Sequence, residues 1–80
     1  YFEPTGNALF FLYDDRPGVI GIIGGRLAEE GVNIEEMRNT LDSDSGRSLV
    51  IMKVDQHVSD ELVRRIGSEV ATSAAFSIKL

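Results

Sequence analysis

Apolar residues gather in four short blocks that predict four β-strands. Residues 7–14 (NALFFLYD) and 47–55 (RSLVIMKVD) carry apolar side chains at both odd and even positions, which is typical of buried strands. Residues 32–41 (VNIEEMRNTL) alternate at first and then become polar, as expected of an edge strand whose charges discourage unwanted pairing. Residues 75–80 (AFSIKL) alternate throughout and are predicted to close the sheet.

The first of two predicted helices spans residues 17–30. Pro17 suits a first helical position because its missing N–H is not needed there, and Gly31 stands where glycine commonly ends a helix. Three glycines inside this helix each lower its stability by about 0.5–1 kcal/mol relative to alanine. They are Gly21, Gly24 and Gly25. Tight packing on the protein's own sheet is the ordinary use for such glycines, and close approach of a partner or ligand is the alternative.

The second predicted helix begins after Ser59, whose hydroxyl suits an N-cap, and its apolar stripe comprises Leu62, Val63, Ile66 and Val70. The order of elements is then strand, helix, strand, strand, helix, strand, with a turn over residues 42–46. Right-handed crossovers convert this order into an α+β, ferredoxin-like βαββαβ sandwich, a four-stranded antiparallel sheet with both helices on one face. The first and third strands are central in this arrangement, and residues 32–41 form an edge.

Composition restricts both the size and the partners of the protein. The chain has 80 residues, a net charge of −5 and no cysteine. This length predicts one domain over residues 7–80, with residues 1–6 leading in from an upstream domain. The acidic balance argues against nucleic acid, and no apolar run approaches the ~20 residues of a membrane span. The lack of cysteine excludes disulfides and thiolate zinc sites.

Catalytic candidates are few. His57 is the only histidine and stands in a polar turn, where an exposed loop residue is the expected role. Arg16 follows the first strand, as in a phosphate-binding loop, but Asp14 and Asp15 beside it would repel a phosphate. Residues 48–54 lack the aromatic side chains on which an RNA-recognition domain stacks bases. The sequence therefore predicts no catalytic residue and no metal ligand.

A binding site is predicted where the first strand meets the first helix. Backbone N–H groups at a helix start, with the helix dipole behind them, favour a small carboxylate, and residues 14–18 (DDRPG) form the loop that leads there. Asn33 follows the far end of the same helix and offers an amide that both donates and accepts hydrogen bonds.

The motifs around this loop resemble the signature of ACT domains, a family of small amino-acid-binding regulatory modules. They are DRPGVIG (15–21), LAE (27–29) and GVNI (31–34), and the resemblance extends over residues 8–80. Within the family, the chain is most similar to the C-terminal regulatory domain of D-3-phosphoglycerate dehydrogenases, with the ACT modules of L-serine dehydratases as the near alternative. The resemblance implies a module without chemistry of its own in a cytoplasmic enzyme of serine biosynthesis, whose NAD is bound elsewhere.

The resemblance also implies a homodimer joined through strand 32–41 and helix 17–30, with a small amino acid such as L-serine between the copies. The effector-binding residues that it implies are Tyr13, Asp15, Arg16, Pro17, Gly18, Val19, Asn33 and Ile34. Serine-inhibited members have a histidine and an asparagine where this chain has Tyr13 and Asp15, and only Asn33 agrees. Because an ionised Asp15 repels a carboxylate, we expect it to hold the ammonium group instead.

Three alternatives remain open from the sequence. In the first, Asp15 caps the first helix and no ligand binds. In the second, the module only pairs subunits and senses nothing. In the third, the chain is a monomer whose edge strand is protected by Glu35, Glu36 and Arg38. Arg16 is expected to be solvated or paired with an acid.

Overall fold

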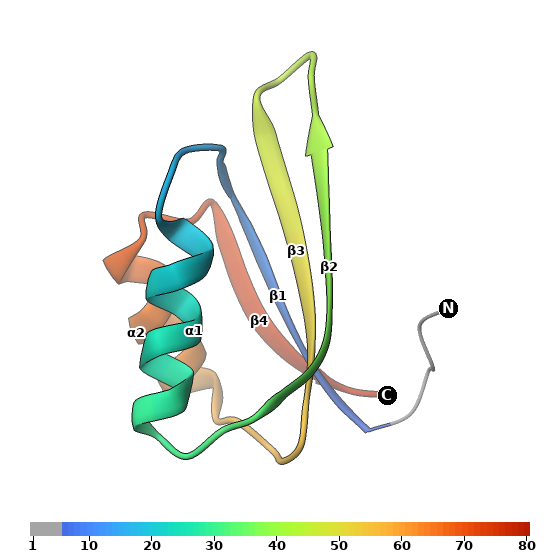
Figure 1. The fold of residues 1–80 in the computed structure, drawn as a ribbon, viewed down its shortest axis with the longest axis vertical. Coiled ribbons are helices and arrows are strands. Elements are labelled where there is room, and N and C mark those ends of the chain that lie inside the picture. The colour runs from blue at the N-terminus through green and yellow to red at the C-terminus, as the bar shows by residue number, and fades with distance from the viewer. Residues whose placement is uncertain (1–5) are drawn as a thin grey trace.

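The fold is a single antiparallel sheet covered by helices on one face. A computed structural model describes residues 6–80, so all but the last residue of the predicted lead-in segment 1–6 lies outside the described residues. The elements are β1 (Asn7–Asp14), α1 (Val19–Glu29), β2 (Ile34–Asp42), β3 (Arg47–Val54), α2 (Asp60–Glu69) and β4 (Ala74–Lys79) (Figure 1). The strand order is β2-β3-β1-β4, so the predicted ferredoxin-like sandwich with central β1 and β3 is confirmed.

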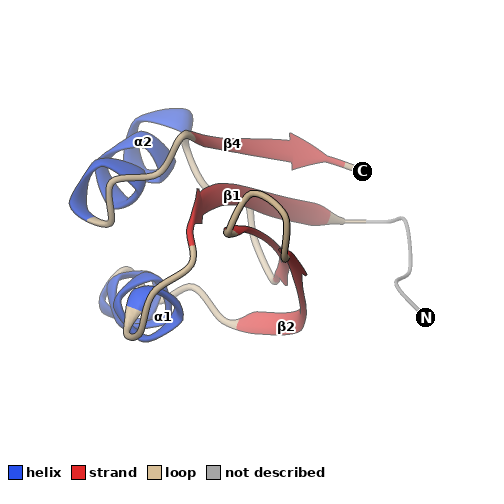
Figure 2. Cartoon of the chain, turned by 90° about the horizontal axis from the view of Figure 1, so that it is seen from above, coloured by secondary structure: helices blue, strands red, loops and turns tan. Residues whose placement is uncertain are grey.

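The core lies between the sheet and the two helices. Alternate positions of β1 and β3 face the helices and are fully buried: Leu9, Phe11, Val50 and Met52. The helices oppose them with buried side chains from both: Val19, Ile23, Leu27, Val63 and Ile66. Seen from above, α1 lies on the side of β2 and α2 on the side of β4, while the other face of the sheet carries no helix within residues 6–80 (Figure 2).

Helix α1 begins two residues later than predicted. Gly18 is its N-cap, with φ 91° in the left-handed region, and Pro17 stands in the preceding turn rather than at the first helical position. A left-handed residue interrupts helical geometry, so Pro17 cannot be part of the helix. At the other end, Gly31 has φ 73° just after the C-cap Glu30, as the glycine pattern predicts.

The glycines of α1 do not pack on the sheet, so that expectation is wrong. A Cβ atom added at Gly21, Gly24 or Gly25 would have no heavy atom within 4 Å apart from its own surroundings in the helix. The tightly packed helical glycine is instead Gly67 in α2, where a Cβ atom would lie 2.7 Å from Thr72 Oγ1 and 2.8 Å from the Cβ of Ala75. Helix α1 therefore presents a surface nearly free of side chains.

The remaining boundaries agree with the sequence to within two residues, as element ends usually do. Strand β2 begins at Ile34 rather than at residue 32, and its pairing with β3 has an irregularity between Ile34 and Glu36. The predicted N-cap is confirmed, since the Ser59 hydroxyl accepts a hydrogen bond from the backbone N–H of Leu62 at 3.2 Å. No helix among residues 6–80 is long and apolar enough to cross a membrane.

Candidate functional site

The loop between β1 and α1 is held against the β2–β3 turn. The backbone N–H of Asp15 donates to the Gly46 carbonyl at 2.9 Å, and the Ser48 hydroxyl donates to Asp15 Oδ1 at 3.2 Å. Because Ser48 is buried, this bond fixes the carboxylate at the end of the sheet while the rest of Asp15 stays exposed. One carboxylate oxygen therefore remains available at a defined position.

The start of α1 carries no capping side chain. Its N-cap is Gly18, no side-chain cap hydrogen bond is present among the described residues, and the first turn holds no acidic residue. The alternative in which Asp15 caps the helix is therefore wrong. The first N–H groups of a helix have no partner within the helix, and the dipole adds partial positive charge there. This end of α1 can accept an anionic group.

Arg16 is exposed, as expected, but its guanidinium also bonds two backbone carbonyls. Its guanidinium donates to the Asp14 carbonyl at 3.2 Å and also to the carbonyl of Val70, the C-cap of α2. Cationic side chains at a helix C-terminus satisfy its last carbonyls and interact favourably with the dipole. Arg16 thus fastens the β1–α1 loop to the end of α2 and is engaged within the chain.

Tyr13 is part of the core. Its side chain lies on the helix side of β1, opposite Ser48, and only 1% of the residue is exposed. Its ring therefore offers almost no surface to a ligand within a single chain. Val19 is also buried, so the exposed part of the predicted loop site consists of Asp15, Arg16, Pro17 and Gly18.

The segment between α1 and β2, which contains Asn33, lies at the opposite end of α1 from this loop (Figure 1). Asn33 is exposed, and its backbone is fixed by two hydrogen bonds with Asp55: Asn33 N donates to Oδ1 at 3.0 Å, and Asp55 N donates to Asn33 O at 3.1 Å. An 11-residue helix is about 16 Å long, so one chain does not bring Asn33 and Ile34 to the loop. The predicted site is divided into two halves.

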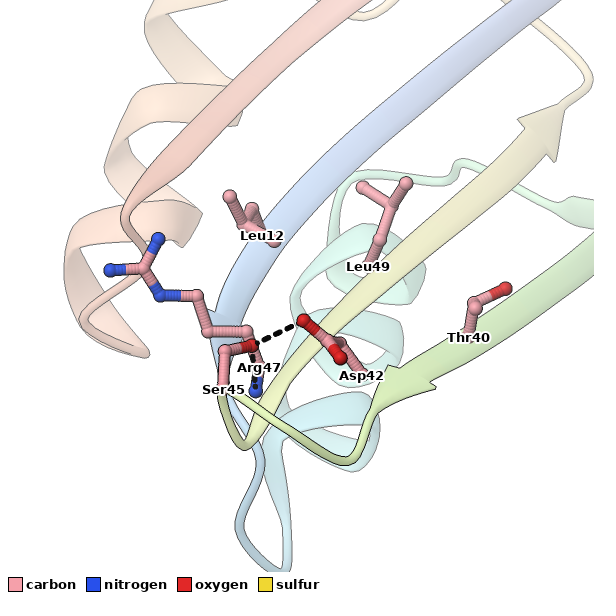
Figure 3. Close-up of a pocket in the computed structure, with 6 residues that line it drawn as sticks. All are labelled: Leu12, Thr40, Asp42, Ser45, Arg47 and Leu49. Atoms are coloured by element: carbon pink, nitrogen blue, oxygen red, sulfur yellow. Dashed lines mark hydrogen bonds between the residues drawn. The ribbon is translucent and has the colours of Figure 1, made fainter.

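The structure also shows a hollow that the sequence did not indicate. It has a volume of about 430 Å³, lies on the face of the sheet without helices and is lined by Leu12, Thr40, Asp42, Ser45, Arg47 and Leu49 (Figure 3). The Ser45 hydroxyl donates to Asp42 at 2.8 Å and, with the Asp44 N–H, lowers the pKa of the Asp42 carboxyl. Only strand alternation, which places Leu12 and Leu49 on one face, could have suggested it.

The described residues contain little that is typical of an active site. His57 is exposed, as expected, in the segment before α2. Among residues 6–80, no group of three or more histidine, cysteine or carboxylate side chains is arranged to hold a metal ion.

The sequence is similar to one segment of D-3-phosphoglycerate dehydrogenases. It is 34% identical over 65 residues to the enzyme of Mycobacterium tuberculosis (strain H37Rv) and 29% identical over 65 residues to that of Bacillus subtilis, in both cases over 81% of this chain. The match to the Synechocystis enzyme is 31% over 77 residues, or 96% of the chain. The chain spans only 12–14% of these relatives' lengths. No family model matches.

The fold is shared with solved ACT domain structures. An ACT domain protein from Streptococcus pneumoniae superimposes with a TM-score of 0.74 over 94% of this chain and 90% of its own, at 15% identity. A formyltetrahydrofolate deformylase from Pseudomonas syringae gives a TM-score of 0.75 over 98% of this chain and 28% of its own, at 19% identity. Identities this low establish the fold alone.

Proposed function

We propose that the chain is the amino-acid-binding regulatory and dimerisation module of a cytoplasmic D-3-phosphoglycerate dehydrogenase. Its fold is that of solved ACT domains, and its sequence is similar to one segment of these dehydrogenases. Two copies join along β2 and α1 and bind a small amino acid such as L-serine between them. The module performs no chemistry, and NAD belongs to the catalytic part of the parent enzyme. The ACT module of an L-serine dehydratase is the alternative parent.

The β2–α1 surface supports the pairing of two copies. No described strand pairs with the outer edge of β2, and unpaired strand edges bind other strands readily. Met37 and Leu41 point to the helix side of β2 but are 47% and 55% exposed, because no helix covers them. On α1, the half-buried Ile20 and the bare Gly24 lie one helical turn apart, on the flank opposite to Arg26 and its partner Glu69 of α2. This flank of α1 therefore faces the same side of the fold as the β2 edge.

The division of the binding site carries the proposal. If two copies pair their β2 strands antiparallel about a two-fold axis, each α1 runs antiparallel to its partner. The end of one α1 that precedes Asn33 then lies beside the start of the other, where Asp15 and Gly18 stand. Two composite sites result, each with the loop of one copy and the amide of the other. The two halves that one chain keeps apart are reunited by this pairing.

The chemistry of each composite site suits a zwitterion. The uncapped start of α1 takes the carboxylate, and the Asp15 oxygen that Ser48 does not engage takes the ammonium group. The exposed Asn33 amide then supplies a donor and an acceptor for a short polar side chain. A ligand held by two copies stabilises one relative arrangement of them, and couplings of this kind typically amount to about 1–3 kcal/mol.

Calorimetric titration of the chain with L-serine, glycine and L-alanine tests the proposal. We expect binding of at least one of these amino acids, together with tighter dimerisation in sedimentation experiments. Asn33→Ala should weaken binding at least about tenfold while the chain stays dimeric, because the amide contacts ligand rather than the strand edge. Glu61→Ala, on the exposed side of α2, is the control and should bind as the unaltered chain does.

A module that pairs subunits without sensing is the second candidate, since the β2–α1 surface supports it equally. It predicts a dimer that none of the amino acids binds. No binding with dimerisation intact would therefore leave only this candidate, and a chain that is monomeric at millimolar concentration would exclude both.

A further inference from the structure

The face of the sheet without helices is apolar at its centre; we refer to it as the open face. Strand pairing places four half-buried side chains there: Phe10, Leu12, Leu49 and Ile51. Phe76 and Ile78 of β4 continue this surface and are 44% and 40% exposed. The Phe10 and Phe76 rings stack at 5.0 Å with an interplanar angle of 6°, and we refer to this stacked pair as the platform. When one face of an antiparallel sheet meets only water, the side chains on that face are normally polar.

Charge on the open face is balanced, although the chain as a whole is strongly acidic. The strand register places three acids and three bases on this side of the sheet, of which Lys53 is only 8% exposed: Asp14, Glu36, Asp42, Arg38, Arg47 and Lys53. The net charge of the chain is −5, so the excess negative charge lies elsewhere, away from this face. Two copies of an acidic chain repel one another least through a neutral surface. A partner with a strong charge of either sign would find no complementary field here.

We propose that the open face is a self-association surface on which a second copy stacks, sheet against sheet. Stacking sets the two helix layers on opposite outer sides. Facing sheets pack about 10 Å apart and interdigitate their side chains, so the apolar platform becomes a second core. The hollow beside Leu12 and Leu49 leaves room for a side chain of the facing copy.

The area of the face determines how strong this contact is. Four strands of about eight residues cover roughly 19 by 26 Å, so one stacked pair removes about 1,000 Å² in total from water. Stable interfaces begin near about 1,200 Å². A single pair is therefore weak, whereas pairing along β2 doubles the sheet and the stacked area with it. The tetrameric form of this inference rests on the proposed function, but the stack itself does not.

Sedimentation across micromolar to millimolar concentrations, with two surface variants, tests the stack. The unaltered chain should form tetramers as its concentration rises. Phe76→Glu places a charge on the platform and should stop assembly at the dimer, with at least about a tenfold rise in the dissociation constant of the stack. Leu41→Glu, a matched control on the β2–α1 surface, should leave a weak dimer formed by the open face alone. The double variant should be monomeric.

Circular dichroism of each variant establishes that it is folded, and Ile78→Ser supplies a second, uncharged change on the same face. Added salt should preserve or strengthen the stack, because it screens the repulsion between two acidic chains. A folded Phe76→Glu variant with unchanged association would overturn the stack, as would unaltered chain that forms only the dimer disrupted by Leu41→Glu. In those cases the open face belongs to a different partner. If Leu41→Glu leaves the assembly state unchanged, two copies do not pair along β2, and that result does not contradict the stack.

Discussion

The glycines show how one residue type serves two different purposes in one fold. Gly67 fits against Thr72 and Ala75, where a Cβ atom would overlap both, whereas Gly25 faces open space. The sequence alone could not separate them, because both are helical glycines and the atoms that meet Gly67 belong to residues beyond the end of its own helix. Packing across a fold brings residues together that spacing along the chain does not reveal. The expectation for the α1 glycines was wrong for this reason.

Alanine substitutions should separate the two roles. Gly67→Ala should lower the free energy of unfolding by about 1–3 kcal/mol, because the methyl group must displace Thr72 and Ala75. Gly25→Ala should raise it by up to about 1 kcal/mol in dilute, unpaired chain, since alanine favours the helix and meets no obstacle. Urea unfolding at low protein concentration measures both changes. Equal effects of the two substitutions would show that the contacts of Gly67 are unimportant.

The same argument applies to the candidate site. The sequence could place Asp15 and Gly18 in the loop before the first helix and Asn33 after its far end, because loops and helix ends leave local signals. The burial of Tyr13 and the engagement of Arg16 by Val70 could not, since both depend on the side of β1 that faces the helices and on the distant end of α2.

At the scale of elements, the pattern of apolar residues predicted every helix and strand because each has its own periodicity and terminal residues. The pattern could not show which parts of the sheet the two helices cover. Met37 and Phe76 are apolar in strands that alternate, yet each is more than 40% exposed, because α1 and α2 cover only one face and reach only part of it. The exposed apolar surfaces are visible only in the assembled fold.

One contact between elements predicts a pH dependence. Arg26 of α1 donates through Nε to Glu69 Oε1 of α2 at 2.8 Å, and this hydrogen bond lowers the pKa of the Glu69 carboxyl. A lowered pKa in the folded state gives stability that is present above the ordinary pKa of glutamate. That stability is lost as the pH falls through the folded-state pKa.

Glu69→Gln should therefore destabilise the chain at neutral pH and progressively less as the pH falls below the ordinary glutamate range. Urea unfolding at several pH values measures this difference between the variant and the unaltered chain. Glu30→Gln, an exposed change just beyond α1, is the control and should show a smaller dependence on pH. A Glu69→Gln effect that stays constant down to strongly acidic pH would mean that the ion pair with Arg26 contributes nothing.

At the scale of the whole molecule, three surface features of this small domain favour association with other copies. The β2–α1 surface is an unpaired edge with exposed Met37 and Leu41, the open face carries the Phe10–Phe76 platform, and the predicted binding site is divided between the two ends of α1. A domain of this size buries a limited core, so association adds stability that a single copy lacks. The account as a whole depends on a ligand site completed by a second copy.

Mixing two binding-deficient variants tests that claim most directly. Asp15→Ala removes the loop half of the site and Asn33→Ala the amide half, so neither variant alone should bind L-serine or whichever amino acid the unaltered chain binds. After equal amounts are mixed and allowed to exchange subunits, each mixed dimer carries one intact site and one doubly damaged site. Calorimetry should then recover the original affinity at about one site for every four chains. A mixture that binds no better than its components would contradict the account.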